Sequence, residues 1–400
     1  MENRTWWWIG GGAVVLAVIL FFVFSNGDDD SASTTTVPQA AESTTTAPEE
    51  TTTTADGATT TTQAATTTTG APAMTARLTC FVTDDAGVDD RSFNASGWKG
   101  VNDAVASGGA AADPILLESA SEADYQPHVE NCLAQGSEHI VTSGWKLSGT
   151  TETFAAANPD VQWTIIDFGT VGDNVTGLEY QTDEAAFAAG YLAAGMSQTG
   201  VVGTYGGVDI PTVTIFMDGY ARGVAHYNEV KGTDVKVLGW EPGNPDAAIM
   251  TGTFDPGDPA VRATCETLLD EGADIILPVG GAINLPCGVA IQDRGIDGAL
   301  IGVDADATEA MPAEYVDLWL TTILKGLAVQ TQRSIEADAA GSPFGGQSFV
   351  GNLENGAVGL SEFHSWADRV PAELAAEVEQ VLADITDGTI DWEKYPVGAG

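Results

Sequence analysis

The stretch from Phe81 to Gly100 gathers side chains that could recognise a small molecule. Three carboxylates, a flat apolar ring and an amide that both donates and accepts hydrogen bonds lie close together, namely Asp84, Asp89, Asp90, Phe93 and Asn94. This mixture suits a ligand with an aromatic face and polar edges. A bare phosphate fits it less well, because the carboxylates would repel it. An ordinary turn between a strand and a helix is the alternative interpretation.

The elements on either side would place this stretch at the edge of a sheet. A β-rich run, Leu78–Val82, stops at the acidic loop. Ser92 fits the N-cap of the next helix, because a serine hydroxyl can accept a hydrogen bond from the first free N–H groups. The loop would then lie at the carboxyl end of a first strand, where open α/β sheets bind ligands.

The chain lacks the motifs of the common enzyme classes. Its four histidines are scattered, and none has a histidine, cysteine or carboxylate partner at metal-ligand spacing. Gly-x-Ser-x-Gly, His-Glu-x-x-His and P-loop patterns are absent. Asp304-x-Asp306 lacks the glycine and the terminal glutamate of a calcium loop. We therefore expect a binding protein without metal or cofactor, not an enzyme.

The net charge of the chain limits the classes of molecule that it can bind. Acidic residues outnumber basic residues 57 to 14, which gives a formal net charge of −43. A nucleic acid would be repelled, so we expect no nucleic-acid partner. The N-terminal segment holds few of these acids, so the globular surface should be acidic, and neutral or cationic ligands fit it better than polyanions.

Residues 1–27 predict a transmembrane signal anchor. Trp6–Phe24 is a run of 19 residues without a charge, long enough to cross a hydrocarbon core of about 30 Å. Arg4 precedes it and three aspartates follow it, so the positive-inside tendency leaves the rest of the chain on the extracytoplasmic side of the cell membrane. A cleaved signal peptide is the alternative, but neither a small-x-small cleavage site nor a lipid-accepting cysteine follows the run.

Residues 28–75 predict a disordered linker. The segment consists largely of Thr, Ala, Ser, Pro and acidic residues, and it contains no aromatic residue. It cannot bury enough apolar surface to offset the entropy lost on ordering. The linker would let the following module reach a partner at the membrane.

Four cysteines, Cys80, Cys132, Cys265 and Cys287, lie in the predicted exported part. An even number in an oxidising compartment indicates two disulfides with three connectivities to choose from. The local choice pairs Cys80 with Cys132 and Cys265 with Cys287. Zinc binding is the alternative, although no Cys-x-x-Cys or nearby histidine supports it.

Strand-like and helix-like stretches alternate after the linker. The apolar, strand-like runs are Leu78–Val82, His139–Ser143, Val161–Asp167, Val201–Gly206, Val235–Trp240, Asp274–Val279 and Ala299–Val303. The helical patterns between and after them include Asp183–Gln198, Val213–Val230, Pro259–Gly272 and Pro371–Ile385. This alternation predicts an α/β fold with parallel sheets. The module is too long for a single core of this kind, so we expect two lobes.

Several motifs resemble the basic membrane protein (BMP) family, and they occur in the family's order from about residue 76 to 390. The family comprises substrate-binding proteins of ABC importers and is similar to the purine-nucleoside receptor lipoprotein. The opening motif is Asp84-x-x-Gly87-x-x-Asp90-x-Ser92-Phe93-Asn94. Further matches are Tyr180–Gly190, Gly206-Gly207 with Ile210-Pro211, Phe216–Tyr220, Gly272–Ile276, Ile301–Asp306 and Leu320–Lys325.

The resemblance implies two Rossmann-like lobes joined by a hinge, of the type I periplasmic-binding-protein kind. It places the first lobe at residues 76–182 plus about 307–340, and the second at 183–306 plus about 341–400. The ligand would lie between the lobes at the carboxyl ends of both sheets. The chain would cross between lobes near Gln181–Asp183, around Asp306 and after Ala339.

The resemblance also implies a ligand-binding set. Phe93 and Phe254 would stack on the two faces of a purine, and Asp84 and Asn94 would read its edge. The ribose would meet Asp167, Asp304 and Lys325, with a close backbone approach at Gly280. For three of them another interpretation is open: Phe254 as core, Asp167 as a turn cap and Lys325 as a solvated surface charge. Trp145 also lies near the expected cleft, where it either contacts ligand or packs its lobe.

These features together predict an extracytoplasmic solute-binding protein of an ABC importer. We expect a monomer that closes its lobes over a nucleoside-like ligand and then docks on an ABC permease. The alternative is a surface-tethered sensory or adhesive protein that uses the same fold without transport.

Overall fold

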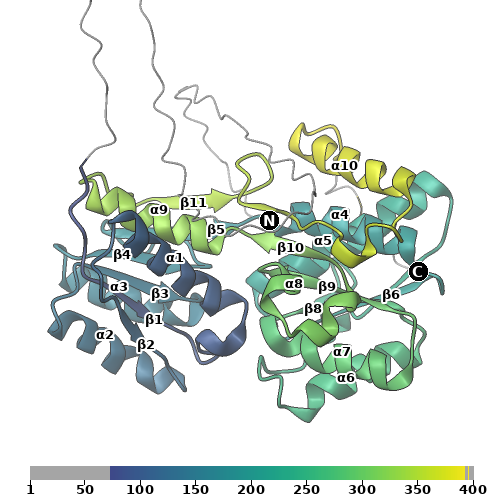
Figure 1. Cartoon of the computed structure of the whole chain (residues 1–400), viewed down its shortest axis with the longest axis horizontal. Helices are drawn as coiled ribbons and strands as arrows, with labels where there is room; N and C mark the ends of the chain where they lie inside the picture. The colour runs from purple at the N-terminus through teal and green to yellow at the C-terminus, as the bar shows by residue number, and fades with distance from the viewer. Residues whose placement is uncertain (1–72, 392–394, 396–400) are drawn as a thin grey trace, which may run out of the picture. The chain divides into compact units, whose positions relative to one another are not determined.

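The computed structural model describes residues 73–391 and residue 395. Two six-stranded sheets organise these residues, and each sheet forms the centre of one lobe (Figure 1). The structure thus confirms the predicted two-lobe α/β fold. The predicted anchor and the predicted linker as far as residue 72 lie outside the described residues. Within residues 73–391, none of the helices combines the length and the apolar character needed to cross a bilayer.

The first sheet has the strand order β11–β5–β4–β3–β1–β2, and all of its pairs are parallel. Its strands are β1 (Thr79–Val82), β2 (Ile115–Leu117), β3 (His139–Ser143), β4 (Gln162–Ile166), β5 (Val175–Tyr180) and β11 (Ser348–Gly351). The helices that follow its first three strands are α1 (Phe93–Ser107), α2 (Tyr125–Ala134) and α3 (Ser148–Ala157). Parallel strands joined by helices bring all the strand ends that precede a helix to one edge of the sheet.

The second sheet repeats this plan with the order β12–β10–β9–β8–β6–β7. Its strands are β6 (Val201–Gly206), β7 (Lys236–Leu238), β8 (Ile275–Val279), β9 (Ala299–Asp304), β10 (Trp319–Lys325) and β12 (Val358–Leu360). Only β12 runs antiparallel to its neighbour, β10. The helices of this lobe include α5 (Pro211–Lys231), α6 (Pro259–Asp270), α7 (Asn284–Arg294), α8 (Ala307–Ala310) and α10 (Ala372–Thr386).

Short 3-10 segments occupy several of the connections. They are η1 (Val88–Asp90), η2 (Glu122–Asp124), η3 (Trp145–Leu147), η4 (Pro245–Ala247), η5 (Gly281–Ile283), η6 (Ala313–Leu318) and η7 (His364–Trp366). Two of them, η3 and η5, follow β3 and β8 at equivalent places in the two lobes. They form part of the connections at the carboxyl edges of the sheets.

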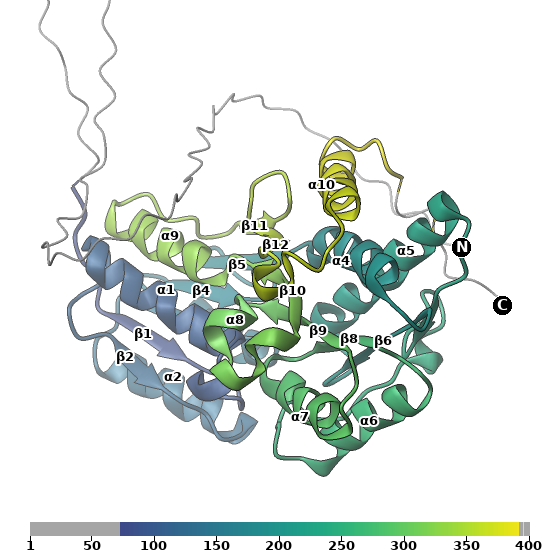
Figure 2. The ribbon, with the colours of Figure 1, turned by 45° about the vertical axis from the view of Figure 1, so that its right-hand side comes forward.

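Two helices leave the sheet whose strand precedes them. Helix α4 (Thr182–Met196) follows β5 but packs on α5, and α9 (Leu327–Ala339) follows β10 but packs on α1 (Figures 1 and 2). Glycines allow the close approach in both pairs. A Cβ at Gly223 would lie 1.8 Å from the Phe187 carbonyl oxygen, and a Cβ at Gly100 would lie 2.4 Å from that of Ala328. Each lobe therefore holds a helix that enters from the other.

These crossings correct the predicted lobe boundaries. The crossing near Gln181–Asp183 lies where it was expected. Strand β10, however, belongs to the second sheet and β11 to the first, whereas the prediction placed residues 307–340 in the first lobe and 341–400 in the second. Sheet membership is set by hydrogen bonds to strands far away in the chain, which a local pattern does not contain. The chain changes lobe after Lys325 and again between β11 and β12.

The predicted cysteine pairing is confirmed. Cys80 in β1 is bonded to Cys132 in α2, and Cys265 in α6 is bonded to Cys287 in α7. All four thiols are consumed in disulfides, which removes the zinc alternative. Each bridge joins elements of one lobe and leaves the crossings between lobes unconstrained.

Candidate functional site

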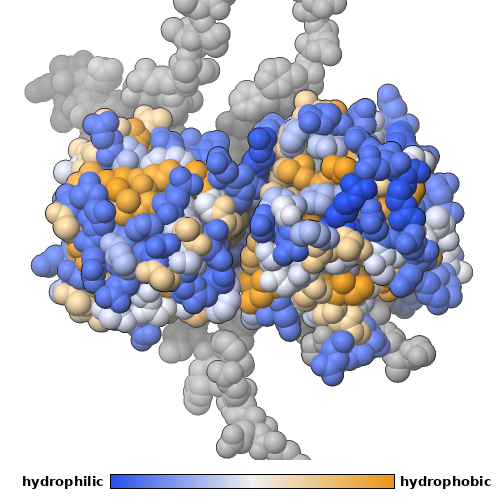
Figure 3. All heavy atoms as spheres, turned by 90° about the horizontal axis from the view of Figure 1, so that it is seen from below, coloured by the Kyte–Doolittle hydropathy of each residue, from blue (hydrophilic) through white to orange (hydrophobic). Residues whose placement is uncertain are grey.

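A pocket lies between the lobes at the carboxyl ends of both sheets. The empty space within it is about 730 Å³ when the open solvent at its mouth is included. All eight residues of the predicted ligand set line it: Asp84, Phe93, Asn94, Asp167, Phe254, Gly280, Asp304 and Lys325. In the space-filling view, a furrow separates the two lobes (Figure 3).

The start of α1 differs in one respect from the prediction. Ser92 occupies the N-cap position, but its side chain makes no capping hydrogen bond. Asp90 takes that role instead, because its carboxylate accepts hydrogen bonds from the backbone N–H groups of Ser92, Asn94 and Ala95 at 2.7–3.0 Å. Burial raises the pKa of Asp90 to about 6, although these hydrogen bonds oppose the shift.

The Ser92 hydroxyl spans the cleft instead. It donates to Oδ2 of Asp304 at 2.9 Å and lies 3.3 Å from the carbonyl oxygen of Val303, both in the second lobe. Ser92 is 1% exposed. The sequence motif that begins α1 therefore does two things: Asp90 caps the helix, and Ser92 joins the lobes.

One end of the pocket is rich in hydrogen-bond acceptors. The Asn94 side-chain amide donates to Oδ1 of Asp84 at 2.8 Å and to Oδ2 of Asp90 at 3.1 Å. Its own oxygen, Oδ1, is buried and has no hydrogen-bond partner among the described residues. Burial raises the pKa of Asp84. A ligand that donates hydrogen bonds would satisfy this end of the pocket.

The other end holds a buried cation. The ammonium group of Lys325 lies 2.6 Å from Oδ2 of Asp167 and 3.9 Å from Oδ1 of Asp304. The rings of Phe93, Tyr180 and Phe216 surround it at 5.4–5.5 Å from their centroids. Only 3% of the Lys325 side chain is exposed. Lys325 is therefore not the solvated surface charge that the alternative interpretation required.

The two aspartates beside Lys325 occupy equivalent places in the two lobes. Asp167 directly follows β4 and Asp304 ends β9. Both have left-handed backbones, with φ of 59° and 68°, a conformation that costs free energy for residues other than glycine and that is concentrated at functional sites. Burial raises the pKa of Asp167, although Lys325 opposes the shift. The ion pair of Asp167 joins the lobes, so this carboxylate does more than cap a turn.

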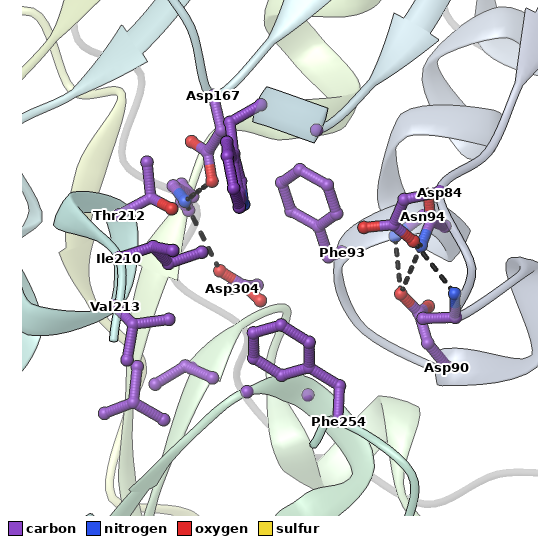
Figure 4. A pocket seen from close by; sticks show the side chains of 18 of the residues that line it. Asp84, Asp90, Phe93, Asn94, Asp167, Ile210, Thr212, Val213, Phe254 and Asp304 are labelled. Atoms are coloured by element: carbon purple, nitrogen blue, oxygen red, sulfur yellow. Dashed lines mark hydrogen bonds and ion pairs between the residues drawn. The ribbon is translucent and has the colours of Figure 1, made fainter. Parts of the chain in front are cut away.

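The aromatic rings of Phe93 and Phe254 border the pocket from different lobes. Figure 4 shows them on two sides of the same space, with Asp84, Asn94 and Asp90 together on one flank and Asp167 on the other. Gly280 has a φ of 151°, and a Cβ there would lie 2.7 Å from the Phe254 ring. The space that Gly280 leaves open is thus taken by Phe254.

Sequence reasoning missed part of the lining. The second lobe contributes an apolar group from the start of α5 and its approach, namely Ile210, Val213 and Phe216, together with Thr212. Ile210 and Phe216 lay inside motifs of the resemblance, which was the signal available for them. Lys146 also lines the pocket, and its signal was its place just after a strand and a glycine. Trp145 beside it, which the sequence analysis placed near the expected cleft, lines the pocket as well.

Two α/β lobes around a pocket at the carboxyl ends of both sheets define the class of bilobal solute-binding folds. A solved solute-binding protein of an ABC transporter system from Aeropyrum pernix K1 is similar, with a TM-score of 0.67, 24% identity, and coverage of 78% of this chain and 92% of that chain. An ABC transporter solute-binding protein from Conexibacter woesei has a TM-score of 0.60 at 22% identity, covering 78% of this chain and 97% of the other. These likenesses establish the fold.

The family follows from the sequence match. Residues 78–386 match the Bmp family, described as ABC transporter substrate-binding protein PnrA-like, and the chain belongs to this family. Basic membrane protein A1 of Borrelia garinii is 26% identical over 76% of this chain and 85% of its own length. The ABC transporter nucleoside-binding protein BmpA of Lactococcus lactis is 26% identical over 77% of this chain and 87% of its own length. The chain is accordingly a substrate-binding protein and not an enzyme.

Proposed function

We propose that this protein is an extracytoplasmic receptor that captures a purine-nucleoside-like ligand for an ABC importer. The observation that carries the proposal is the content of one pocket. Two aromatic rings from opposite lobes, a carboxamide flanked by carboxylates, and a buried lysine between two aspartates all line it. Nucleoside binding by the similar Lactococcus lactis protein, as its name states, supports the same ligand class.

Each part of a nucleoside has a counterpart in this arrangement. Phe93 and Phe254 offer stacking surfaces for the two faces of a base. Asp84 and Asn94 offer acceptors for hydrogen-bond donors on the edge of the base. The carboxylates of Asp167 and Asp304 can accept hydroxyl protons of the ribose. Buried polar groups left unpaired by a wrong ligand disfavour that ligand, which gives discrimination.

The same carboxylates argue against nucleotides. Asp84, Asp90, Asp167 and Asp304 all line the pocket, and only Lys325 and Lys146 bring positive charge to it. Lys325 is already paired with Asp167, and Lys146 with Asp85 outside the lining set. A phosphate group would therefore meet net negative charge, and we expect AMP and GMP to bind far more weakly than the nucleosides.

Delivery to the membrane rests on the predicted anchor and linker. The proposal is that Trp6–Phe24 tethers the protein and that the Thr-rich segment lets the lobes reach a permease. Ligand would stabilise the closed arrangement of the lobes, and that arrangement would dock. Deletion of the gene tests this step. If the deletion abolished a cellular response but left nucleoside uptake intact, the protein would be a sensory protein, and the proposed delivery to an importer would be wrong.

Isothermal calorimetry on the full chain tests the ligand class. We expect binding of adenosine, guanosine or inosine, accompanied by a rise in unfolding temperature as ligand exceeds its Kd. We expect no heat from AMP, GMP, free ribose or D-glucose. Heat from a sugar or a peptide, with none from the three nucleosides, would contradict the proposal.

Phe93→Ala tests the stacking part. We expect it to weaken nucleoside binding by about 1–3 kcal/mol through lost stacking. Because Phe93 is only partly buried at the start of α1, the lobe should stay folded. Phe344→Ala, which removes an exposed ring that does not line the pocket, is the matched control. Equal affinities of wild type and Phe93→Ala would assign Phe93 to packing alone.

A further inference from the structure

Phe254 lies over two residues that have no side chain. A Cβ built at Gly207 would lie 2.3 Å from Cδ1 and Cε1 of the Phe254 ring, and a Cβ at Gly280 would lie 2.7 and 2.9 Å from the same atoms. Real side chains do not approach so closely, so the ring occupies the volume that both glycines leave free. Phe254 and Gly280 line the pocket, whereas Gly207 does not.

The two glycines come from neighbouring strand ends. Gly206, the last residue of β6, is in register with Val279, the last residue of β8. Gly207 and Gly280 are the next residues, and the Gly207 N–H donates to the Val279 carbonyl oxygen at 2.9 Å. The edge of the Phe254 ring thus rests on the backbone of two hydrogen-bonded strands, which cannot move aside independently.

The loop that carries Phe254 is fixed to the same strand end. The Gly206 N–H donates to Ile249 O at 3.0 Å, and the N–H groups of Thr251 and Gly252 donate back to the carbonyl oxygens of Gly206 and Gly207 at 2.9 and 2.8 Å. The Thr251 hydroxyl lies 3.2 Å from Gly207 O and 2.7 Å from Thr253 O. With its backbone held in this way, Phe254 can change position mainly by rotating its side chain.

The first lobe lacks an equivalent support for its ring. Gly144 follows β3 as Gly280 follows β8, but a Cβ at Gly144 would first meet Oδ2 of Asp84 at 3.2 Å and would reach the Phe93 ring only at 3.7 Å. The second distance is ordinary van der Waals contact. Of the two rings Phe93 and Phe254, it is therefore Phe254 of the second lobe that packs closely against glycine.

We propose that Gly207, from outside the pocket, positions Phe254 and thereby sets the width of the space between Phe254 and Phe93. A side chain at Gly207 would push the ring into that space. A flat bicyclic base would then be excluded. Gly207 is accordingly a positioning residue that determines ligand size. This inference rests on the proposed function, since it assigns the base to the space between the rings.

Gly207→Ala is the informative substitution because Gly207 does not have a left-handed φ, whereas Gly280 does. Alanine at 207 therefore avoids the left-handed strain that a side chain at 280 would meet. The carbonyl oxygen of Thr253, 3.0 Å from that methyl position, stays in place in every variant, so a cycle with Phe254→Ala isolates the contribution of the ring. Gly359→Ala, where a Cβ would meet nothing within 4 Å, is the control.

The experiment measures unfolding temperature and guanosine affinity for the full chain, both single variants and the double variant. We expect Gly207→Ala to lower the unfolding temperature and to weaken guanosine binding about tenfold or more, as overpacking does. In the Phe254→Ala background, the same change should leave both quantities nearly unaltered. A Gly207→Ala protein that fails to fold, beside a double variant that folds, gives the same support.

Equal losses in the two backgrounds, no loss in the wild-type background, or failure of both Gly207→Ala proteins to fold would overturn the inference. The unfolding temperatures can be measured without any ligand. A wild-type protein that binds no nucleoside would therefore refute the proposed function, while the cycle of unfolding temperatures would still decide whether Gly207 positions the ring.

Discussion

The two lobes share one plan but give the pocket different walls. The first lobe supplies three carboxylates, an amide, a lysine and two aromatic rings, from Asp84, Asp90, Phe93, Asn94, Trp145, Lys146 and Asp167. The second lobe supplies mostly apolar surface around Asp304 and Lys325, including Ile210, Val213, Phe216, Phe254 and Val279. If the protein closes over a nucleoside as proposed, an apolar wall would cover a polar one. The first lobe would then recognise the polar edges of the ligand, and the second lobe would exclude water.

The electrostatics follow from this difference. Burial is the first cause of the raised pKa values of Asp84, Asp90 and Asp167, all in the first lobe. A contact that crosses the cleft offsets part of this cost at Asp167, because Lys325 of the second lobe pairs with it. In the other direction, Ser92 of the first lobe donates to Asp304 of the second. The polar wall therefore depends on the other lobe for part of its stabilisation.

The largest expected effect comes from removing the cation. Lys325→Met leaves Asp167 buried without its partner, and breaking a buried pair in this way costs about 3–5 kcal/mol of unfolding free energy. Urea denaturation measures the loss. The double variant Lys325→Met with Asp167→Asn should recover much of it. Lys99→Met, which breaks an exposed pair with Asp103, should be nearly neutral. A Lys325→Met protein as stable as wild type would contradict the dependence between the walls.

The two disulfides differ in the length of the loop that each closes, so their contributions to stability allow a second comparison of the lobes. The bridge of the first lobe closes a separation of 52 residues and that of the second lobe one of 22. Chain entropy predicts about 3–4 kcal/mol for each bridge, with the first larger by about 0.8 kcal/mol. Replacing each cysteine pair with alanine and measuring unfolding by urea checks this order. Nucleoside affinity should change little, because neither bridge crosses the cleft. A larger loss in the second lobe would reverse the comparison.

The alternation of strands and helices could be predicted because the central strands are fully buried and contain pairs of adjacent branched apolar residues, Ile140-Val141 in β3 and Ile275-Ile276 in β8. All five residues of β3 and all five of β8 are buried, and such runs stand out in a sequence. Short edge strands do not: β11 exposes two of its four residues, and its sheet is chosen by hydrogen bonds to β5. The lobe boundaries after residue 306 were wrong for this reason.

The pocket residues could be predicted to the extent that they follow strands. Asp84, Asp167, Gly280 and Asp304 end or follow parallel strands, whose carboxyl ends share one edge. Ser92 could not be predicted, because its partner Asp304 lies 212 residues away in the chain. Lys325 is buried by residues of both lobes, and a local sequence pattern gives no information about such long-range contacts.

Ser92→Ala tests the hydrogen bond between the two lobes, and we expect a smaller effect than those of Lys325→Met and of disulfide removal. It removes the hydrogen bond to Asp304 but leaves α1 capped by Asp90, so the stability of the lobe should change little. We expect about 0.5–1.5 kcal/mol weaker binding of every nucleoside, appearing as faster dissociation. Small-angle X-ray scattering should show a more open ligand-free protein.

The control for this change is Ser107→Ala on the same helix. Its hydroxyl bonds to Ala104 O and to Glu336, both within the first lobe, so neither closure nor affinity should change. A Ser92→Ala protein with wild-type scattering and wild-type dissociation rates would mean that this hydrogen bond contributes nothing to closure.

The smallest effect concerns two of the three crossings between lobes, those made by α4 and α9. The first turn of α4 contains Asp183 and Glu184, whereas the first turn of α9 has no acidic residue. Burial, and then the charge of Glu184, raises the pKa of Asp183 to about 7. The folded protein therefore holds this proton more tightly than the unfolded chain, whose aspartate has a pKa near 3.8. By linkage, the stabilisation from this proton is fully present below about pH 4 and is lost as the pH rises through about 7.

Asp183→Asn should remove this part of the pH dependence. The unfolding free energy of the variant minus that of wild type should increase from pH 4.5 to pH 8, because only the wild type places a charge in this partly buried position. Urea denaturation across that range, with the exposed Asp160→Asn as control, provides the measurement. The difference should be flat for the control. A flat difference for Asp183→Asn as well would show that the α4 crossing does not titrate, and the two crossings would then be electrostatically alike.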